Sequence, residues 1–157
     1  WREGLSKFEG LPHRLKFVRE INRIKFYDDS IATTPGSAIA AMNAFAEPKV
    51  LILGGSDKGA DLSELISRIS ESSIDELREV ILIGKEAEKL NSKLKDKNFT
   101  RIKNLGLNTT MQQVVKTAFA DAQSGDVVIL SPAHASFDMF KSYVDRGEQF
   151  IKAVGEL

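Results

Sequence analysis

The sequence predicts an α/β fold of three layers, in which a mainly parallel sheet lies between helices on both of its faces. Short apolar runs rich in β-branched residues recur along the chain, and each run stops at a turn residue. Segments with the apolar spacing of amphipathic helices separate these runs. Strands that alternate with helices form βαβ units, whose right-handed crossovers place helices on both faces of the sheet. This combination is typical of a Rossmann-like domain.

Six segments have strand character. They are rich in β-branched or aromatic residues and lie, in chain order, at residues 14–18, 24–27, 50–53, 80–83, 99–103 and 127–130. The runs at 50–53, 80–83 and 127–130 are apolar throughout, so we expect these strands to be buried on both faces. The run at 99–103 is weaker, and we expect it nearer an edge of the sheet.

Capping residues and apolar spacing predict the helices between these strands. Thr34 and Pro35 suit the N-cap and the first position of a helix. Two further helix starts have capping-box spacing, Asp61 with Glu64 and Thr109 with Gln112. The apolar residues expected on the inner helix faces are Ala38, Met42 and Phe45; Leu62, Leu65, Ile66 and Ile69; Ala87, Leu90 and Leu94; Met111, Val114, Val115, Ala118, Phe119 and Ala122; and Phe140, Tyr143, Val144, Phe150, Ile151 and Val154.

Composition restricts the function classes. The 157 residues are 42% hydrophobic and 28% charged, as in one globular domain. The 22 basic and 22 acidic residues cancel, which argues against a dedicated nucleic-acid binder. Cysteine is absent, so disulfides and thiolate metal sites are excluded. No apolar stretch approaches the ~18 residues of a membrane span, and no signal peptide is recognisable. The absence of cysteine fits a reducing cytosol, and the absence of a long apolar stretch predicts no membrane partner.

Ligands of an open parallel sheet bind beyond the carboxyl ends of its strands. We therefore expect four loops to meet at one edge, each directly after a predicted strand. Their polar and glycine residues are Asp28, Asp29, Ser30, Thr33 and Thr34; Gly54, Gly55, Ser56, Asp57, Lys58 and Gly59; Gly84 and Lys85; and Ser131, His134 and Ser136.

The loop at residues 53–59 is the most suggestive anion site. Its glycines would let the backbone approach an anion, Lys58 supplies positive charge, and the following helix would offer free N–H groups. Neither a dinucleotide fingerprint nor a Walker A sequence is present. A tight turn with a solvated lysine accounts for the loop equally well.

The other candidates also have two interpretations. Ser136 could bind a carboxylate or cap a helix, and its surroundings do not match a nucleophile elbow. Arg14 suits phosphate recognition. His134 is interpreted as a packing or hydrogen-bonding residue rather than a metal ligand. Asp28 and Asp29 could bind ribose hydroxyls or Mg²⁺, although adjacent aspartates after a strand are commonly turn formers.

Taken together, the motifs resemble the C-terminal domain of the Mur ligase family, and within it the branch that adds D-glutamate. The matching segments are residues 10–14, 28–35, 53–59 and 130–138, followed by Arg146-Gly147 and Phe150. Four motifs in the family's order, spread over nearly the whole chain, are far more specific than any one of them.

The resemblance implies an ATP-dependent, amide-forming ligase of peptidoglycan synthesis in the cytoplasm. In such an enzyme ATP phosphorylates the carboxylate of UDP-N-acetylmuramoyl-L-alanine, and the amine of D-glutamate attacks the acyl phosphate. The implied protein is a monomer of three domains. Residues 1–12 would lead from a central ATPase domain, which carries the P-loop and the Mg²⁺ ligands, into a C-terminal domain at residues 13–157. This chain alone would hold no metal and have no ligase activity.

The resemblance also assigns residues to the amino-acid site. Thr33, Lys58 and Ser136 would bind the carboxylates of D-glutamate. The backbone of Phe137 would assist them, and Tyr143 would lie beside the amino acid. A dicarboxylate needs a cation together with hydroxyl and N–H donors, and these loops supply them.

At the nucleotide, the resemblance implies contacts from Arg14 to phosphate and from Asp29 to ribose, with His13 beside them. Ile31 departs from the family's pattern, which commonly has lysine at this position, so a charge that would face phosphate is missing. Contact with ATP is therefore less strongly implied than contact with D-glutamate.

Two alternatives stay open. The chain could be the corresponding domain of another Mur ligase or of folylpolyglutamate synthetase, with a different amino acid as substrate. It could also be a stand-alone Rossmann-like module that binds an amino acid or a nucleotide without chemistry. A Gly-Thr-Asn-Gly-Lys-Thr motif upstream in the same reading frame would favour a ligase.

Overall fold

The computed structural model describes residues 10–157, so the expected leader at residues 1–12 lies largely outside the described residues. The strands are β1 (Lys16–Ile21), β2 (Ile24–Asp28), β3 (Lys49–Gly54), β4 (Leu77–Ile83), β5 (Ile102–Gly106) and β6 (Val127–Leu130). The helices are α2 (Pro35–Asn43), α3 (Ser63–Ser70), α4 (Ala87–Asp96), α5 (Met111–Asp121) and α6 (Tyr143–Gly155). Among the described residues, no helix combines the length and the apolar character needed to cross a membrane.

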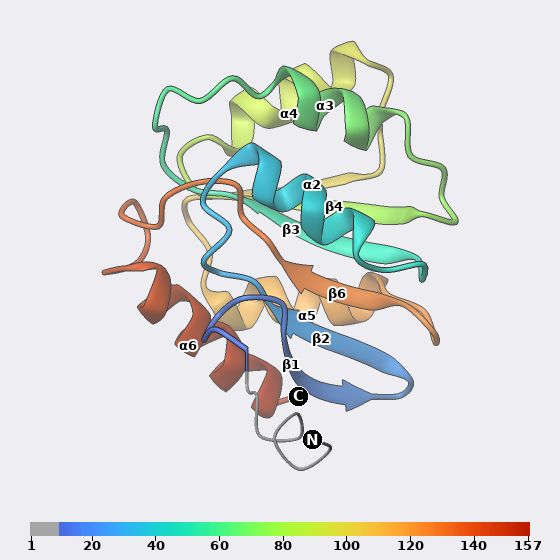
Figure 1. Cartoon of the computed structure of the whole chain (residues 1–157), viewed down its shortest axis with the longest axis vertical. Helices are drawn as coiled ribbons and strands as arrows, with labels where there is room; N and C mark the ends of the chain where they lie inside the picture. The colour runs from blue at the N-terminus through green and yellow to red at the C-terminus, as the bar shows by residue number, and fades with distance from the viewer. Residues whose placement is uncertain (1–9) are drawn as a thin grey trace, which may run out of the picture.

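The strands form one sheet in the order β1-β2-β6-β3-β4-β5 (Figure 1). β1 is antiparallel to β2, and every other neighbouring pair is parallel. Leu51 and Leu53 of β3 face a core shared with α2, α3 and α4, whereas Val50 and Ile52 face a core shared with α5 and α6. The mainly parallel sheet between two layers of helices is therefore confirmed.

All six predicted strands are present but several ends differ: β1 spans Lys16–Ile21 rather than residues 14–18, and β4 begins at Leu77 rather than at residue 80. β6 coincides with the predicted run, whereas β5 begins three residues later than expected. Phe99 does not pair with β4: its N–H donates to the carbonyl of Leu94 at 3.0 Å, after Asn98 with a φ of 61°. These contacts form a Schellman cap at the end of α4, with Phe99 and Leu94 packed in one core. The aromatic residue that suggested a strand therefore ends a helix.

The start of α2 agrees with the prediction, but the end of its inner face does not. Thr34 is the N-cap, and its Oγ1 accepts a hydrogen bond from the N–H of Ser37 at 3.3 Å. Ala38 and Met42 are buried as expected. Phe45 lies beyond the end of the helix, where its ring packs against the ring of Tyr27.

The capping box of α5 occurs one residue later than the sequence suggested. Thr110 Oγ1 accepts from the N–H of Gln113, and Gln113 Oε1 accepts from the N–H of Thr110. The predicted pair, Thr109 with Gln112, was wrong. Two threonines and two glutamines, separated by Met111, offer the same spacing in two registers, and the structure has the second, in which buried Met111 is the first residue of the helix.

The residues that α6 buries differ in part from those predicted. Phe150 and Val154 are fully buried as expected, but Val144 and Ile151 are each 38% exposed. Arg146, which is 1% exposed, takes a place on the inner face.

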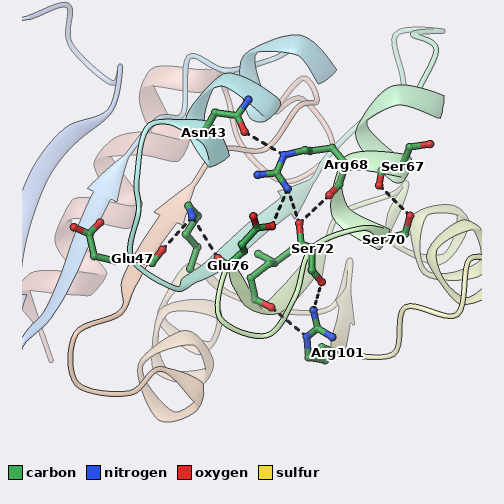
Figure 2. A network of polar contacts seen from close by, with 10 residues as sticks. Asn43, Glu47, Ser67, Arg68, Ser70, Ser72, Glu76 and Arg101 are labelled. Carbon is green, nitrogen blue, oxygen red and sulfur yellow. Dashed lines mark hydrogen bonds and ion pairs between the residues drawn. The ribbon is translucent and has the colours of Figure 1, made fainter.

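A polar network closes the end of the sheet where β3 and β4 begin, opposite to the carboxyl ends (Figure 2). Arg68 Nη1 donates to Ser72 Oγ at 2.7 Å and to Glu76 Oε2 at 3.3 Å. Arg101 Nη2 donates to the carbonyl of Ser72, and buried Lys49 Nζ donates to the carbonyl of Glu76. Burial lowers the pKa of Lys49. The charged side chains here bind loop carbonyls, a hydroxyl and a carboxylate, and so hold the elements together.

Candidate functional site

The connections of β6 define a crevice at the carboxyl edge of the sheet. β6 leads to α6 on one face, whereas its neighbours β2 and β3 lead to α2 and α3 on the other face (Figure 1). The loops after these strands therefore diverge, and ligands of open α/β sheets bind at such a topological switch point.

Backbone hydrogen bonds join the loops at this edge. The N–H of Ala133 donates to the carbonyl of Ala32 at 2.8 Å. The N–H of Ser56 donates to the carbonyl of Ala135 at 2.9 Å, within an isolated antiparallel bridge. The N–H of Glu86, after β4, donates to the carbonyl of Gly55. The expected convergence of four loops at one edge is confirmed.

Thr33, Lys58 and Ser136 lie directly beyond these contacts. Thr33 follows Ala32 and is half-buried, Ser136 follows Ala135 and is buried, and Lys58 is exposed two residues after Ser56. Within residues 10–157, the Lys58 ammonium forms no ion pair or hydrogen bond, so its charge is available to an anion. Contact of the three side chains with one ligand stays a prediction.

Gly54 and Gly55 let the loop after β3 pack closely against neighbouring backbone. A Cβ at Gly54 would collide with the carbonyl oxygen of Ile83, and a Cβ at Gly55 with that of Ala135. Both glycines have positive φ, 126° and 150°. Their small size lets this loop pack against neighbouring backbone of the same chain, which accounts for glycine at both positions, while the approach of an anion to this loop stays a prediction.

The amino end of α3 is occupied by a carboxylate of the chain itself. Asp61 Oδ1 accepts from the N–H of Ser63 at 2.9 Å and from Ser63 Oγ at 2.6 Å, and these hydrogen bonds lower the pKa of Asp61. Leu62 is the N-cap without a side-chain hydrogen bond, so the predicted capping box with Glu64 was also wrong. Asp61 therefore occupies one N–H group of this helix start, and Lys58 supplies the positive charge of the loop.

Two aromatic residues lie at the entrance to α6. Phe137 is 74% exposed, and Tyr143, the first residue of the helix, is 38% exposed. The carbonyl of Tyr143 accepts from Ser30 Oγ at 2.6 Å, and its ring meets the His13 ring edge to face. The main chain of Tyr143 is therefore fixed to the loop after β2, while its ring reaches solvent.

Arg14 and Asp29 line one hollow of about 200 Å³, together with Ile31. The Asp29 carboxylate is buried: Oδ1 accepts from the N–H of Leu15 at 3.1 Å, and Oδ2 accepts from Ser131 Oγ at 2.7 Å. Burial raises the pKa of Asp29 despite these hydrogen bonds. The hollow brings together two of the three residues expected at the nucleotide.

His13, the third of them, points into the domain. It is buried with a φ of 62°, and its Nδ1 lies 2.6 Å from Asp28 Oδ2. Gly147 of α6 lies against this pair, where a Cβ would collide with the His13 ring. The carbonyl of His13 accepts from the N–H of Ile31. His13 thus fixes the turn that carries Arg14 and does not line the hollow.

Arg146 is the residue that sequence reasoning from spacing missed. Its guanidinium is buried and donates to Ser30 and to the carbonyl of His134, and burial lowers its pKa to about 10. The available signal was its position: Arg146 lies four residues before Phe150 on the apolar stripe. A charged residue within such a stripe indicates a built polar contact.

His134 is buried, and its Nδ1 lies 2.9 Å from the carbonyl of Pro132, which confirms its interpretation as a hydrogen-bonding core residue. Burial lowers its pKa. Within residues 10–157, no three histidine, aspartate or glutamate side chains are placed to hold a metal ion.

A family model described as "Mur ligase, glutamate ligase domain" matches residues 13–134. The UDP-N-acetylmuramoylalanine--D-glutamate ligase of Nitrosomonas europaea is 43% identical over 151 residues, which are 96% of this chain and 30% of that protein. The protein of the same name from Caldicellulosiruptor bescii is 41% identical over 153 residues, 98% of this chain and 32% of that protein. The chain thus spans about a third of the length of these relatives.

Two solved structures share the fold. The MurF ligase of Thermotoga maritima in complex with ADP has a TM-score of 0.58 and 18% identity, over 97% of this chain and 33% of that one. MurF from Acinetobacter baumannii has a TM-score of 0.62 and 18% identity, over 99% of this chain and 33% of that one.

Proposed function

The chain belongs to the Mur ligase family, and from this membership we propose that it is the amino-acid-binding C-terminal domain of an ATP-dependent UDP-N-acetylmuramoylalanine–D-glutamate ligase. In this proposal residues 13–157 form the domain, and residues 1–12 lead into it from a central ATPase domain. The enzyme acts as a monomer in the cytoplasm, with neither nucleic acid nor a membrane as partner. The names of the relatives and the family match from residue 13 onward support it.

The proposed reaction has two steps in the whole enzyme. A carboxylate oxygen of UDP-N-acetylmuramoyl-L-alanine attacks the γ-phosphorus of ATP, and ADP leaves. The amine of D-glutamate then attacks the acyl carbon, loses a proton, and expels phosphate to leave the amide. Mg²⁺ is expected on the central domain. The part of this chain is to hold D-glutamate and to close over the nucleotide, which excludes water from the hydrolysable acyl phosphate.

The observation that carries the proposal is the convergence of three donor-bearing loops on one crevice, with a cation that has no partner among the described residues. In the proposal the Lys58 ammonium pairs with one carboxylate of D-glutamate, and the hydroxyls of Thr33 and Ser136 donate to the carboxylates. The N–H of Phe137 is a further donor, and the Tyr143 ring covers the amino acid. Charge-assisted hydrogen bonds of this kind suit a dicarboxylate.

The hollow shared by Arg14 and Asp29 supports the proposed nucleotide contact. Arg14 is exposed and can reach phosphate, while the fixed Asp29 carboxylate can accept from a ribose hydroxyl at the wall of the hollow. His13 contributes indirectly, through the turn that it fixes with Asp28.

The experiment measures ADP formation by the full-length protein with UDP-N-acetylmuramoyl-L-alanine and D-glutamate. We expect Lys58→Ala to raise the KM for D-glutamate at least about tenfold, as expected when a charged hydrogen bond is lost. Lys85→Ala removes an exposed lysine from the adjacent loop at the same edge and should change KM less than about twofold. An unchanged KM in Lys58→Ala, or a better rate with another amino acid in a substrate panel, would contradict the assignment.

A further inference from the structure

We propose that Arg146 is a positioning residue that sets the geometry of the amino-acid site, because its guanidinium joins the loop that carries Thr33 to the loop that carries Ser136. The inference rests on the proposed function for its substrate and on the contacts of Arg146 for its mechanism. Arg146 is 1% exposed, so it acts through the two loops without touching a ligand.

The guanidinium makes three hydrogen bonds to the two loops. Nε donates to Ser30 Oγ at 3.0 Å, Nη2 donates to the carbonyl of Ser30 at 2.8 Å, and Nη1 donates to the carbonyl of His134 at 3.0 Å. Ser30 lies three residues before Thr33, and His134 lies two residues before Ser136. One planar group therefore fixes the separation of two loops that leave the sheet toward opposite faces.

The hydrogen bond from Arg146 to Ser30 Oγ also connects the guanidinium to the start of α6. Ser30 Oγ accepts from Arg146 and donates to the carbonyl of Tyr143 at 2.6 Å. Four of the five residues assigned to D-glutamate, all except Lys58, are thus on segments that Arg146 holds in place; they are Thr33, Ser136, Phe137 and Tyr143.

Packing alone does not account for an arginine here. No carboxylate hydrogen-bonds to the guanidinium among the described residues, although Asp28 and Asp138 lie near enough to attract it. Apolar residues of similar volume commonly stabilise a core as well as buried charges do or better. The specific property of arginine is a rigid fork of donors, which lysine cannot reproduce.

The nucleotide side has its own contacts in addition to those of Arg146 with the neighbouring Ser30. Asp29 hydrogen-bonds to the N–H of Leu15 and to Ser131 Oγ, and neither contact involves Arg146. Loss of the Arg146 fork should therefore affect D-glutamate more than ATP, whereas a general loss of structure would affect both.

The test compares Arg146→Lys, Arg146→Met and the control Lys152→Met, all in the full-length protein. Lys152 is exposed on the same helix. In Arg146→Lys we expect the KM for D-glutamate to rise about tenfold, as for one lost charged hydrogen bond, with the KM for ATP changed less than about twofold. Arg146→Met should have a larger effect, and if it fails to fold, the lysine variant decides. Lys152→Met should match the wild type.

Equal increases in both KM values, or no change in either, would overturn the inference. If the wild-type protein forms no ADP in response to D-glutamate, the proposed function fails, and hydrogen exchange then decides the role of Arg146. In Arg146→Lys we expect faster amide exchange in residues 30–33 and in residues 134–137 together. Unchanged exchange in either segment would refute the positioning role independently of the substrate.

Discussion

Gly54 and Gly55 show how neighbouring backbone, rather than a ligand, can require glycine. From the sequence, a glycine pair beside a lysine is compatible with an anion loop and with a tight turn. The positions that a Cβ would take are filled by the carbonyls of Ile83 and Ala135. Lys58, three residues after Gly55, has no partner among residues 10–157, so the structural role of the glycines and the proposed ligand-binding role of the lysine belong to separate positions of one loop.

We predict that Gly55→Ala lowers the free energy of unfolding by at least about 2 kcal/mol, because the added methyl group meets the Ala135 carbonyl at a φ that favours glycine. Gly36→Ala is the control: this glycine lies in α2 with open space beside it and should gain about 0.5 kcal/mol. Urea denaturation of both variants measures the difference. If Gly55→Ala were as stable as Gly36→Ala, the loop would have relaxed around the added methyl group.

The charge of Glu79 changes with pH near neutrality. Burial, and then the adjacent Asp121 carboxylate, raise the pKa of Glu79 from 4.5 to about 7. The carboxylate of Asp121 is bound on one side by Lys103 Nζ at 2.6 Å, and its other oxygen has no hydrogen-bond donor within residues 10–157. A protonated Glu79 supplies one.

Because the pKa of Glu79 is higher in the folded state, its favourable contribution is complete below pH 4.5 and is lost as pH rises through about 7. Glu79→Gln keeps a donor at every pH. We therefore expect this variant to raise Tm more at pH 8 than at pH 5, measured by thermal unfolding. A gain that is the same at both pH values would show that Glu79 does not titrate in this range.

At the scale of elements, the strands were predictable from their apolar runs. The ends of strands and helices were less predictable, because they depend on local hydrogen bonds. Residues 127–130 form β6 as expected, because a strand buried on both faces has a continuous apolar signature. Phe99 was assigned to a strand because an aromatic residue fits both a strand and a hydrophobic helix cap. Asn98, which accepts a positive φ, was the distinguishing residue.

The start of α5 allows a direct test of capping register. Thr110→Ala should lower the free energy of unfolding by about 1 kcal/mol, since it removes the acceptor for the N–H of Gln113. Gln112→Ala, at the position that the sequence suggested for the box, should change stability by less than about 0.5 kcal/mol. Chemical denaturation of the two variants distinguishes the registers, and a larger loss in Gln112→Ala would favour the original one.

At the scale of the whole molecule, strand alternation predicted the layers and the edge where loops converge. It could not predict Arg146, because a guanidinium that binds carbonyls of two loops depends on tertiary structure that no local pattern encodes. Nor could it place His13, whose partner Asp28 is 15 residues away. The candidate site was therefore predictable as a set of loops, but not in the buried contacts that hold those loops.

We predict that this chain alone catalyses no ligation, because the proposed mechanism needs a P-loop domain that these 157 residues do not contain. Phosphate release in the presence of ATP, D-glutamate and UDP-N-acetylmuramoyl-L-alanine should equal that of a protein-free blank. The full-length protein, assayed in parallel, provides the positive control. Turnover by the chain alone would require a nucleotide site within this domain that is sufficient for phosphoryl transfer.

The bridge between Ser56 and Ala135 divides the loop at residues 53–59 into two parts. The first part, the stem, ends at Ser56 and is anchored, and the second part, the tip, carries Lys58. A residue inserted before Ser56 would shift Ser56 out of its pairing with Ala135 and disturb the edge of the sheet. A residue inserted between Asp57 and Gly59 would lengthen the tip alone and extend the reach of the ammonium. Loop-length libraries aimed at longer or shorter acidic substrates should therefore vary the tip and leave the stem intact.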